Sequence, residues 1–236
     1  CKLGSTKLGT VRKARYNMLS RNLLRSISAA AVLWTAGSLP LRAQSKWEVG
    51  GAIGGGFFSN KKLTGSGEAT TGFKPGIGGA FWLGNDFRNR FGGEIRYMYL
   101  RNNAKLSSGN TDITFGAQSH QFTYDFVVYT NSNKSKVRPY FLFGGGVKGF
   151  QGTGKEQAIQ PLLQFAALTK ATQWRAVGNF GGGVKWDVTD RVLLRFDVRD
   201  SISQFPNDVI LPVPPNKAGG IIHNITPSFG IAYRFE

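Results

Sequence analysis

The sequence predicts an all-β protein: a closed transmembrane β-barrel of eight antiparallel, up-and-down strands. Three observations predict this fold. Apolar and polar residues alternate along eight segments, the segments have the length of about ten to fourteen residues that suits a tilted crossing of a hydrocarbon layer, and their connections alternate between long and short. Because a bilayer offers no water to an open sheet edge, such strands are expected to close into a ring.

The clearest of these strands covers residues 191–199. Read at a period of two, it has an apolar face with Val192, Leu194, Phe196 and Val198 and a charged face with Arg195, Asp197 and Arg199. Opposite charges spaced two residues apart fit a crowded interior in which ions pair. The apolar face is then the one that meets lipid.

Seven further segments repeat this alternation along the chain. In order, they are residues 46–57, 73–83, 91–101, 120–129, 139–150, 174–187 and a last strand that ends at 235. Long connections are expected at 58–72, 102–119, 151–173 and 205–222, and shorter ones at 84–90, 130–138 and 188–190. This arrangement is typical of a barrel with one end facing the outside of the cell and the other facing the periplasm.

Outward-facing aromatic residues gather beside the short connections, where an interfacial girdle is expected. They are Trp47, Phe81, Phe91, Trp186, Tyr233 and Phe235. Rings of this kind favour the level of the lipid headgroups because they have an apolar body and, in Trp and Tyr, a polar tip. A secreted β-sandwich is the alternative fold. It does not explain why the aromatic face carries no polar residues between the aromatic ones.

The inward faces carry charged residues that we expect to form a network in the lumen. The candidates are Glu94, Arg96, Asp125, Lys148, Arg175, Lys185, Asp187, Arg195, Asp197 and Arg199. They could line a conduction path or pair with one another and fill the barrel. Eight strands leave an interior wide enough only for side chains or one small ligand, which favours a paired network. Because glycines on inward positions leave more space than larger residues, a narrow or gated cavity is the alternative.

Composition excludes some classes of function. The 236 residues include one cysteine, so no disulfide within the chain is expected, and the 32 glycines suit many short strand boundaries. The formal charge of +17 suggests a nucleic-acid binder, but residues 1–44 carry eight basic side chains and no acidic one. The remaining charges lie on the face opposite the aromatics, so no nucleic-acid partner is expected.

The basic N-terminal segment has the pattern of an export signal. From Met18, Arg21 and Arg25 are followed by an apolar stretch at 27–39 and a small-residue boundary at Ala43. We therefore expect a signal peptide over 18–43, upstream or non-native sequence over 1–17, and the barrel domain over 45–236. The apolar stretch is too short for a permanent transmembrane helix.

These features resemble a known family. The export signal, the eight amphipathic strands, the segment from Arg138-Pro139-Tyr140 to Gly149 and the closing run at 226–235 are similar to the small eight-stranded outer-membrane barrels, the OmpA/OmpX-like group. The resemblance implies export to the outer membrane of a Gram-negative bacterium. It also implies that the barrel assembly machinery recognises the C-terminal strand, although here Glu236 follows Phe235.

No motif in the sequence predicts catalysis, a metal site or a cofactor. Gly144, Gly146 and Gly149 match a dinucleotide-binding pattern, but no helix pattern follows them. Cys1 and the two histidines do not form a plausible cluster of metal ligands. The resemblance extends to barrel enzymes such as the lipid A deacylases, which use a His and a Ser two residues apart, but Ile225 stands at that spacing from His223. We therefore expect a protein that is not an enzyme.

The expected function is that of an integral outer-membrane barrel with a structural or surface-interaction role, a plugged charged lumen and long external loops. A lipid-modifying enzyme or a small-ligand transporter on the same scaffold is the alternative. Expected partners are outer-membrane lipid and lipopolysaccharide, and a monomer is expected. The apolar stretch with Leu162, Leu163, Phe165 and Leu168 is the candidate surface contact, or else it packs over the barrel mouth or at the membrane surface.

Overall fold

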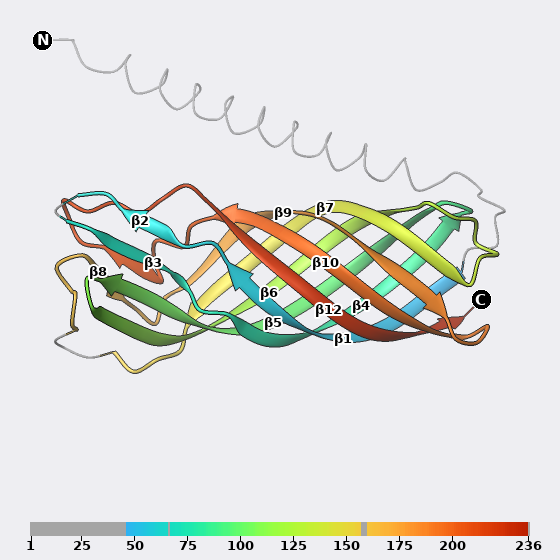
Figure 1. Ribbon diagram of the computed structural model, residues 1–236, viewed down its shortest axis with the longest axis horizontal. Coiled ribbons are helices and arrows are strands. Elements are labelled where there is room, and N and C mark those ends of the chain that lie inside the picture. Colours follow the sequence, from blue (N-terminus) through green and yellow to red (C-terminus); the bar gives the residue numbers. More distant parts are fainter. Residues whose placement is uncertain (1–45, 66, 157–159, 236) are drawn as a thin grey trace, which may run out of the picture. The chain divides into compact units, whose positions relative to one another are not determined.

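The computed structural model describes residues 46–65, 67–156 and 160–235 (Figure 1), so the segments predicted at 1–17 and 18–43 lie outside the described residues. The strands are β1 (Lys46–Phe58), β2 (Lys61–Leu63), β3 (Ala69–Phe73), β4 (Gly76–Arg88), β5 (Phe91–Ser108), β6 (Thr111–Tyr129), β7 (Val137–Gly152), β8 (Ala166–Leu168), β9 (Thr172–Asp187), β10 (Val192–Gln204), β11 (Ile210–Pro212) and β12 (Ile221–Phe235). Among these residues, no helix has the length and apolarity needed to span a bilayer.

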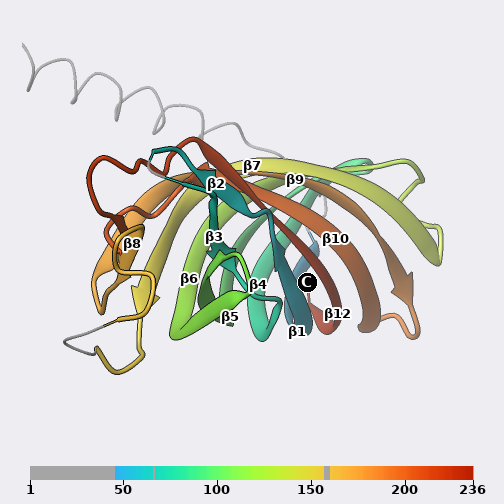
Figure 2. The ribbon, with the colours of Figure 1, turned by 60° about the vertical axis from the view of Figure 1, so that its left-hand side comes forward.

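Eight of the strands form a closed antiparallel ring. Around the ring the order is β1, β4, β5, β6, β7, β9, β10 and β12. The first and last of them pair from Trp47 with Phe235 to Phe58 with Asn224, which leaves no free edge. The strands are tilted (Figure 1) and curve around a common axis (Figure 2). The predicted eight-stranded up-and-down barrel is confirmed.

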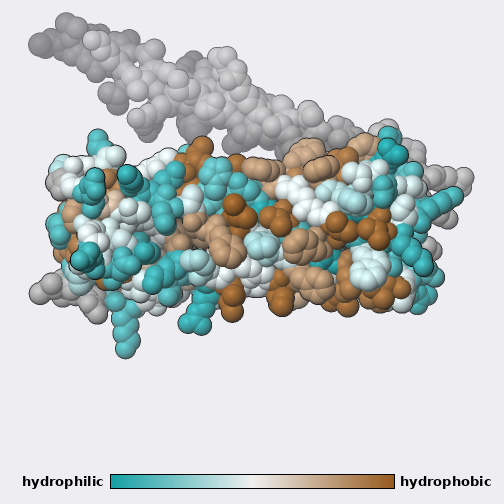
Figure 3. Space-filling view, viewed as in Figure 1, coloured by the Kyte–Doolittle hydropathy of each residue, from teal (hydrophilic) through white to brown (hydrophobic). Residues whose placement is uncertain are grey.

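Side chains alternate between the interior and the exterior of this ring. On β10, Phe196 is 52% exposed on the outer surface, whereas Arg195 and Asp197 are each 1% exposed inside. Apolar side chains cover much of the outer wall, and hydrophilic ones gather towards both ends (Figure 3). An apolar exterior around a charged interior is the arrangement that a hydrocarbon solvent favours.

The connections define two ends of the barrel. At the turn end, short connections at 89–90, 130–136 and 188–191 join neighbouring strands. At the loop end, the chain forms longer segments, including the hairpin of β2 with β3 and the small sheet of β8 with β11.

The prediction of a loop at 102–119 was wrong, because β5 and β6 continue through it as a hairpin. Their pairing runs without a break to Ser108 and Thr111, and the turn between them places Gly109 at a positive φ of 55°. The polarity of the two faces reverses along this extension. Ala104 and Leu106 face inward and are buried, while Asn103 faces outward and is exposed. The pattern of apolar outward residues therefore stops near the middle of β5, although the strand itself continues.

The start of the second predicted strand, at residue 73, was also wrong. Phe73 ends β3, and β4 begins only at Gly76. Pro75 has no backbone N–H to donate to a ladder, which accounts for the interruption. Both β3 and β4 pair with β5, so they follow each other along the same neighbour. The region predicted as a loop at 58–72 thus extends the wall of the barrel.

An apolar cluster, which we call the cap, fills the loop end. Its buried members are Leu63, Ala69, Phe73, Ala104, Leu106, Phe115, Ala117, Phe150, Phe165, Ala166, Leu168, Phe205, Val209, Ile210 and Ile222. They come from the barrel wall and from the segments around β8 and β11. Burial of this apolar surface stabilises the loop end in the manner of a soluble protein core.

The cap corrects the interpretation of the apolar stretch at 162–168. Phe165 is 9% exposed and Leu168 is 3% exposed, so neither is a surface contact. Ala167 pairs with Leu211, which holds this stretch against the segment that supplies Val209 and Ile210. Leu162 packs against the cap, and of the four side chains named from the sequence only Leu163 is well exposed. The stretch is apolar because it covers the interior of the barrel.

Glycines on inward positions allow neighbouring strands to approach closely. A Cβ atom added at Gly144 would run into the carbonyl oxygen of Tyr124, and one added at Gly146 would run into that of Phe122. Both obstacles are backbone atoms of β6, which cannot move without changing the pairing. These two glycines therefore provide space for the tight curvature of an eight-stranded ring.

We predict that Phe196→Arg destabilises the folded barrel in lipid. An Arg on the lipid face near the middle of the bilayer costs about 2 to 4 kcal/mol. The measurement is urea-induced unfolding in lipid vesicles. The control is Val188→Arg, which places the same charge on an exposed side chain in a connection at the turn end. Equal stability of the two variants would contradict the assigned facing of β10.

Candidate functional site

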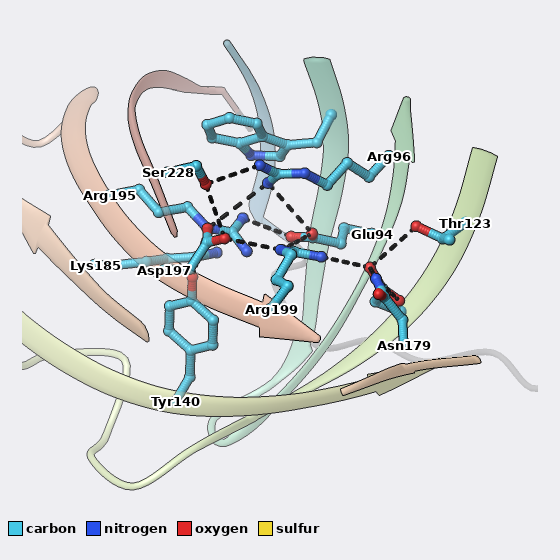
Figure 4. Close-up of polar contacts among 12 residues, drawn as sticks. Glu94, Arg96, Thr123, Tyr140, Asn179, Lys185, Arg195, Asp197, Arg199 and Ser228 are labelled. Atoms are coloured by element: carbon cyan, nitrogen blue, oxygen red, sulfur yellow. Dashed lines mark hydrogen bonds and ion pairs between the residues drawn. The ribbon is translucent and has the colours of Figure 1, made fainter. Parts of the chain in front are cut away.

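Three barrel strands supply the charges at the centre of the interior. Arg195, Asp197 and Arg199 alternate with apolar residues on β10, so all three face inward. Glu94 on β5 and Asp125 on β6 occupy directly opposite positions in their ladder, which places two carboxylates side by side. We call the group formed by these five residues and Arg96 the central network (Figure 4).

Arg199 contacts every carboxylate of the central network. Its Nη2 donates to Oε1 of Glu94 at 2.6 Å, and its Nη1 donates to Oδ2 of Asp125 at 2.6 Å. Its Nε donates to Oδ1 of Asp197 at 2.8 Å. One guanidinium thus donates hydrogen bonds to three carboxylates from three strands, which uses the planar fork of N–H donors that Arg provides.

Asp197 lies between the two arginines of its own strand (Figure 4). Its Oδ2 accepts a hydrogen bond from Nε of Arg195 at 2.8 Å, and Arg195 also donates through Nη1 to Oε2 of Glu94 at 2.5 Å. The hydroxyls of Tyr140 and Ser228 donate to the carboxylate of Asp197 at 3.2 Å and 3.0 Å. The buried carboxylate is therefore compensated on all sides.

Arg96 is held more loosely than the other two arginines. Its Nη2 donates to the hydroxyl of Ser228 at 3.1 Å, and its Nη1 lies 3.7 Å from Oδ2 of Asp197 and 4.0 Å from Oε1 of Glu94. Its guanidinium also lies 5.2 Å from the centre of the Trp82 ring, within the range of a cation–π interaction. Arg96 adds positive charge to a group that Arg195 and Arg199 organise.

A second charged group, which we call the lower network, lies nearer the turn end. Arg138 contacts Oδ2 of Asp86 at 2.6 Å, and Lys185 contacts Oε1 of Glu48 at 2.6 Å. Tyr129 joins the two pairs, because its hydroxyl donates to Asp86 at 2.7 Å and accepts from Lys185 at 2.6 Å. Nη1 of Arg195 lies 3.7 Å from Glu48, so the lower and central networks are continuous.

The two networks are balanced in charge. Five carboxylates (Glu48, Asp86, Glu94, Asp125 and Asp197) pair with five cations (Arg96, Arg138, Lys185, Arg195 and Arg199), and all ten side chains are buried. Arg234, also buried, pairs with Asp187 at 2.8 Å. Such a group can hold strands together across the lumen, because separating the strands would leave buried charges unpaired, which raises the free energy of the barrel.

The structure joins most of the charged residues named from the sequence, but three of them lie apart. Asp187 pairs with Arg234 close to the turn end, and Arg175 is partly exposed, with a 3.5 Å contact to Gln204. Lys148 is buried but has no hydrogen bond among the described residues. These side chains face inward at levels where the central network does not reach.

Sequence reasoning missed three charged members of the lower network. Asp86 and Arg138 were assigned to short connections at 84–90 and 130–138, although both lie within strands. Glu48 lies within the strand predicted at 46–57 but was not named as a charged partner. The signal that could have found them is the alternation itself, extended by a few residues beyond each predicted strand end.

The six aromatic residues named for the girdle lie on the outer wall. Trp47, Phe91, Trp186, Tyr233 and Phe235 are within a few residues of the turn end, and Phe81 lies further along β4. All six are exposed large side chains. Their level relative to a lipid headgroup is a prediction from this placement.

Outside the interior, His223 forms an acid–base pair with Asp200. Their closest atoms, Nδ1 and Oδ2, are 2.7 Å apart. The hydroxyl of Ser59 accepts a hydrogen bond from the backbone N–H of His223 at 3.0 Å, so it is engaged by the backbone. A nucleophile needs a contact with the base to be activated, and this arrangement provides none. The described residues also hold no cluster of three or more His, Cys, Asp or Glu side chains suited to a metal ion.

A closed ring with an apolar exterior and a paired, charged interior defines a membrane-spanning β-barrel. The sequence model of the outer membrane protein beta-barrel domain matches residues 29–235. The chain therefore belongs to this family of outer-membrane barrels.

One of the similar solved structures has a TM-score above 0.5 and agrees with the fold. The chain is similar to a major outer membrane protein from Thermus thermophilus, with 14% sequence identity, a TM-score of 0.51, and coverage of 82% of this chain and 100% of that one. It also matches Neisserial surface protein A, with 13% identity, a TM-score of 0.49, and coverage of 82% and 100% respectively. A third match is Ail of Yersinia pestis, with 14% identity, a TM-score of 0.41, and coverage of 80% and 98%. No curated protein matches the chain significantly.

We predict that Asp197→Ala destabilises the barrel strongly. The substitution removes one of the two carboxylates that Arg195 and Arg199 share, which leaves excess positive charge in the interior. Loss of one partner from a buried ion pair costs about 3 to 5 kcal/mol. The measurement is the free energy of unfolding in lipid vesicles. The matched control is Asp208→Ala, an exposed carboxylate at the loop end, which should change stability by less than about 0.5 kcal/mol. A similar effect of both would show that Asp197 is solvated.

Proposed function

We propose that this protein is a non-conducting outer-membrane barrel with a structural and surface-interaction role. One observation carries the proposal: charged networks fill the interior towards the turn end, and the cap fills it at the loop end. A filled interior leaves the outer surfaces and the external loops as the places where a specific role can reside.

In this proposal the loop end faces the outside of the cell and contacts lipopolysaccharide. Arg101 faces outward on β5, and Lys74 lies beside this strand with its backbone N–H bonded to the carbonyl of Asn103. Both side chains are exposed. They sit above the outward tyrosines Tyr97 and Tyr99, which gives a basic edge over an aromatic wall. Such an edge suits anionic groups at the surface of a membrane.

We also propose that the closing strand β12 serves assembly, because it presents a regular row of outward apolar side chains. Ile225, Phe229, Ile231, Tyr233 and Phe235 are all exposed on the outer wall. In this proposal the barrel assembly machinery binds β12 before it pairs with β1, and the folded protein acts as a monomer.

The test of the closed interior is conductance. Wild-type protein incorporated into a planar bilayer should show no steady current above that of the lipid alone. A variant that combines Phe165→Ala, Leu168→Ala and Phe205→Ala removes large side chains from the cap and serves as the comparison. A steady current through the wild-type barrel would overturn the proposal and favour a transporter.

The test of the surface role is a pair of charge reversals. Lys74→Glu with Arg101→Glu should weaken lipopolysaccharide binding by roughly tenfold or more, since each basic side chain near an anionic surface contributes about 1 kcal/mol. The control is Lys134→Glu with Lys136→Glu, the same change at exposed positions of the turn end. The measurement is lipopolysaccharide bound per mole of protein in detergent. Equal losses in both variants would show a general charge effect and contradict a contact at the loop end.

A further inference from the structure

A polar layer separates the central network from the cap. We call it the Lys148 layer, and it consists of Phe58, Gln121, Lys148, Ser201 and Asn224. These residues come from five different barrel strands, and contacts link them around the lumen. Gln121 pairs with Lys148, and Nε2 of Gln121 donates to Oγ of Ser201 at 3.0 Å. Ser201 pairs with Asn224, and Asn224 pairs with Phe58.

The amine of Lys148 completes this ring of contacts. It lies 4.8 Å from the centre of the Phe58 ring and 5.4 Å from that of Phe150. Phe150 belongs to the cap, and its ring stacks on Phe73 with centroids 5.5 Å apart. The aromatic rings therefore form a roof over the amine and attract its charge, but they offer no hydrogen-bond acceptor.

The central network forms the floor of the Lys148 layer. Oγ of Ser201 donates to Oδ1 of Asn179 at 2.7 Å, and Nδ2 of Asn179 donates to Asp125 at 3.2 Å. Asp125 is bonded to Arg199, so the carboxylates of the floor already have cations as partners. Asp200 is the carboxylate on the neighbouring stretch of β10, and it is paired with His223. No carboxylate among the described residues forms a salt bridge with Lys148.

Four polar atoms of this layer have no hydrogen-bond partner among the described residues. They are Nζ of Lys148, Oε1 of Gln121, and both Nδ2 and Oδ1 of Asn224. The three side chains are between 1% and 5% exposed, so bulk water does not reach them. Buried polar atoms are almost always satisfied in folded proteins, and an isolated buried ammonium is far more costly than a neutral group. A concentration of such atoms at one level points to a bound species that completes them.

We propose that the Lys148 layer binds one small monovalent anion, of the size of chloride or bromide, together with water. Within this layer the unpaired donors are the ammonium of Lys148 and the amide of Asn224, and the ammonium has no salt bridge, whereas the two neighbouring networks are balanced. An anion supplies the missing negative charge. Water bonded to the anion would satisfy Oε1 of Gln121 and Oδ1 of Asn224, which an anion alone cannot do.

The direct test is diffraction from wild-type protein refolded and crystallised in sodium bromide. An anomalous bromide peak in contact with Nζ of Lys148, in the interior between Gln121 and Asn224, is the expected result. An interior that contains water alone, or bromide found only on the outer surface, overturns the proposal. This measurement needs no variant and does not depend on conductance or lipopolysaccharide binding.

The second test measures anion-dependent stability in solution. At constant ionic strength, wild-type protein in detergent should unfold at a higher temperature in chloride than in gluconate, which is too large for the site. Lys148→Met removes the charge with little change in shape, and it should lose this shift. Lys170→Met, at an exposed lysine of the loop end, should retain it. The proposal fails if wild type shows no shift, if Lys148→Met keeps it, or if Lys170→Met loses it equally. Asn224→Leu, which removes the other donor, should also reduce the shift.

Discussion

Ion pairing inside a narrow ring is the constraint on which this structure depends. An eight-stranded barrel has room for side chains and little else, so charges on inward positions must find partners across the lumen. Arg199 bonds carboxylates on β5, β6 and its own strand β10, and Arg195 reaches Glu94 from the same strand. These contacts join opposite walls of the ring. A shift of β10 by one residue would turn both guanidiniums towards lipid, so the networks also determine the register of the wall.

The interior changes character along the barrel axis because the surroundings of the wall change. Along β5, the outward residues pass from Ile95 and Tyr97 to Arg101 and Asn103, while the inward residues pass from Glu94 to Ala104 and Leu106. Where lipid surrounds the wall, the outside is apolar and the inside is charged. Where the wall extends beyond the apolar band, the outside is polar and the inside is packed like a soluble core. The Lys148 layer lies at the level where one arrangement gives way to the other.

This change explains how the loop segments reach a defined position. The strands of the β2–β3 hairpin and of the β8–β11 sheet are each only three to five residues long. Two-stranded units of this length are too short to be stable alone. They are held because Leu63, Leu168 and Ile210 bury their side chains in the cap. The external surface that the loops present is thus attached to the barrel by apolar packing, and the same packing closes the interior at that end.

The sequence by itself determined the fold class, the number of strands in the ring and the facing of residues within the apolar band. Alternation at a period of two decides these because lipid and lumen impose opposite polarity on neighbouring residues, as Phe196 and Asp197 show. It did not determine the extension of β5 and β6 past residue 101, because the polarity of the faces reverses there. Only the tertiary structure decided which charges meet, since Glu94 and Arg199 lie far apart in the chain, and only it showed that Phe165 is buried and that Lys148 has no hydrogen-bond partner within the described part of the chain. Pairing across a lumen depends on distances in three dimensions, and a pattern along one strand does not contain them.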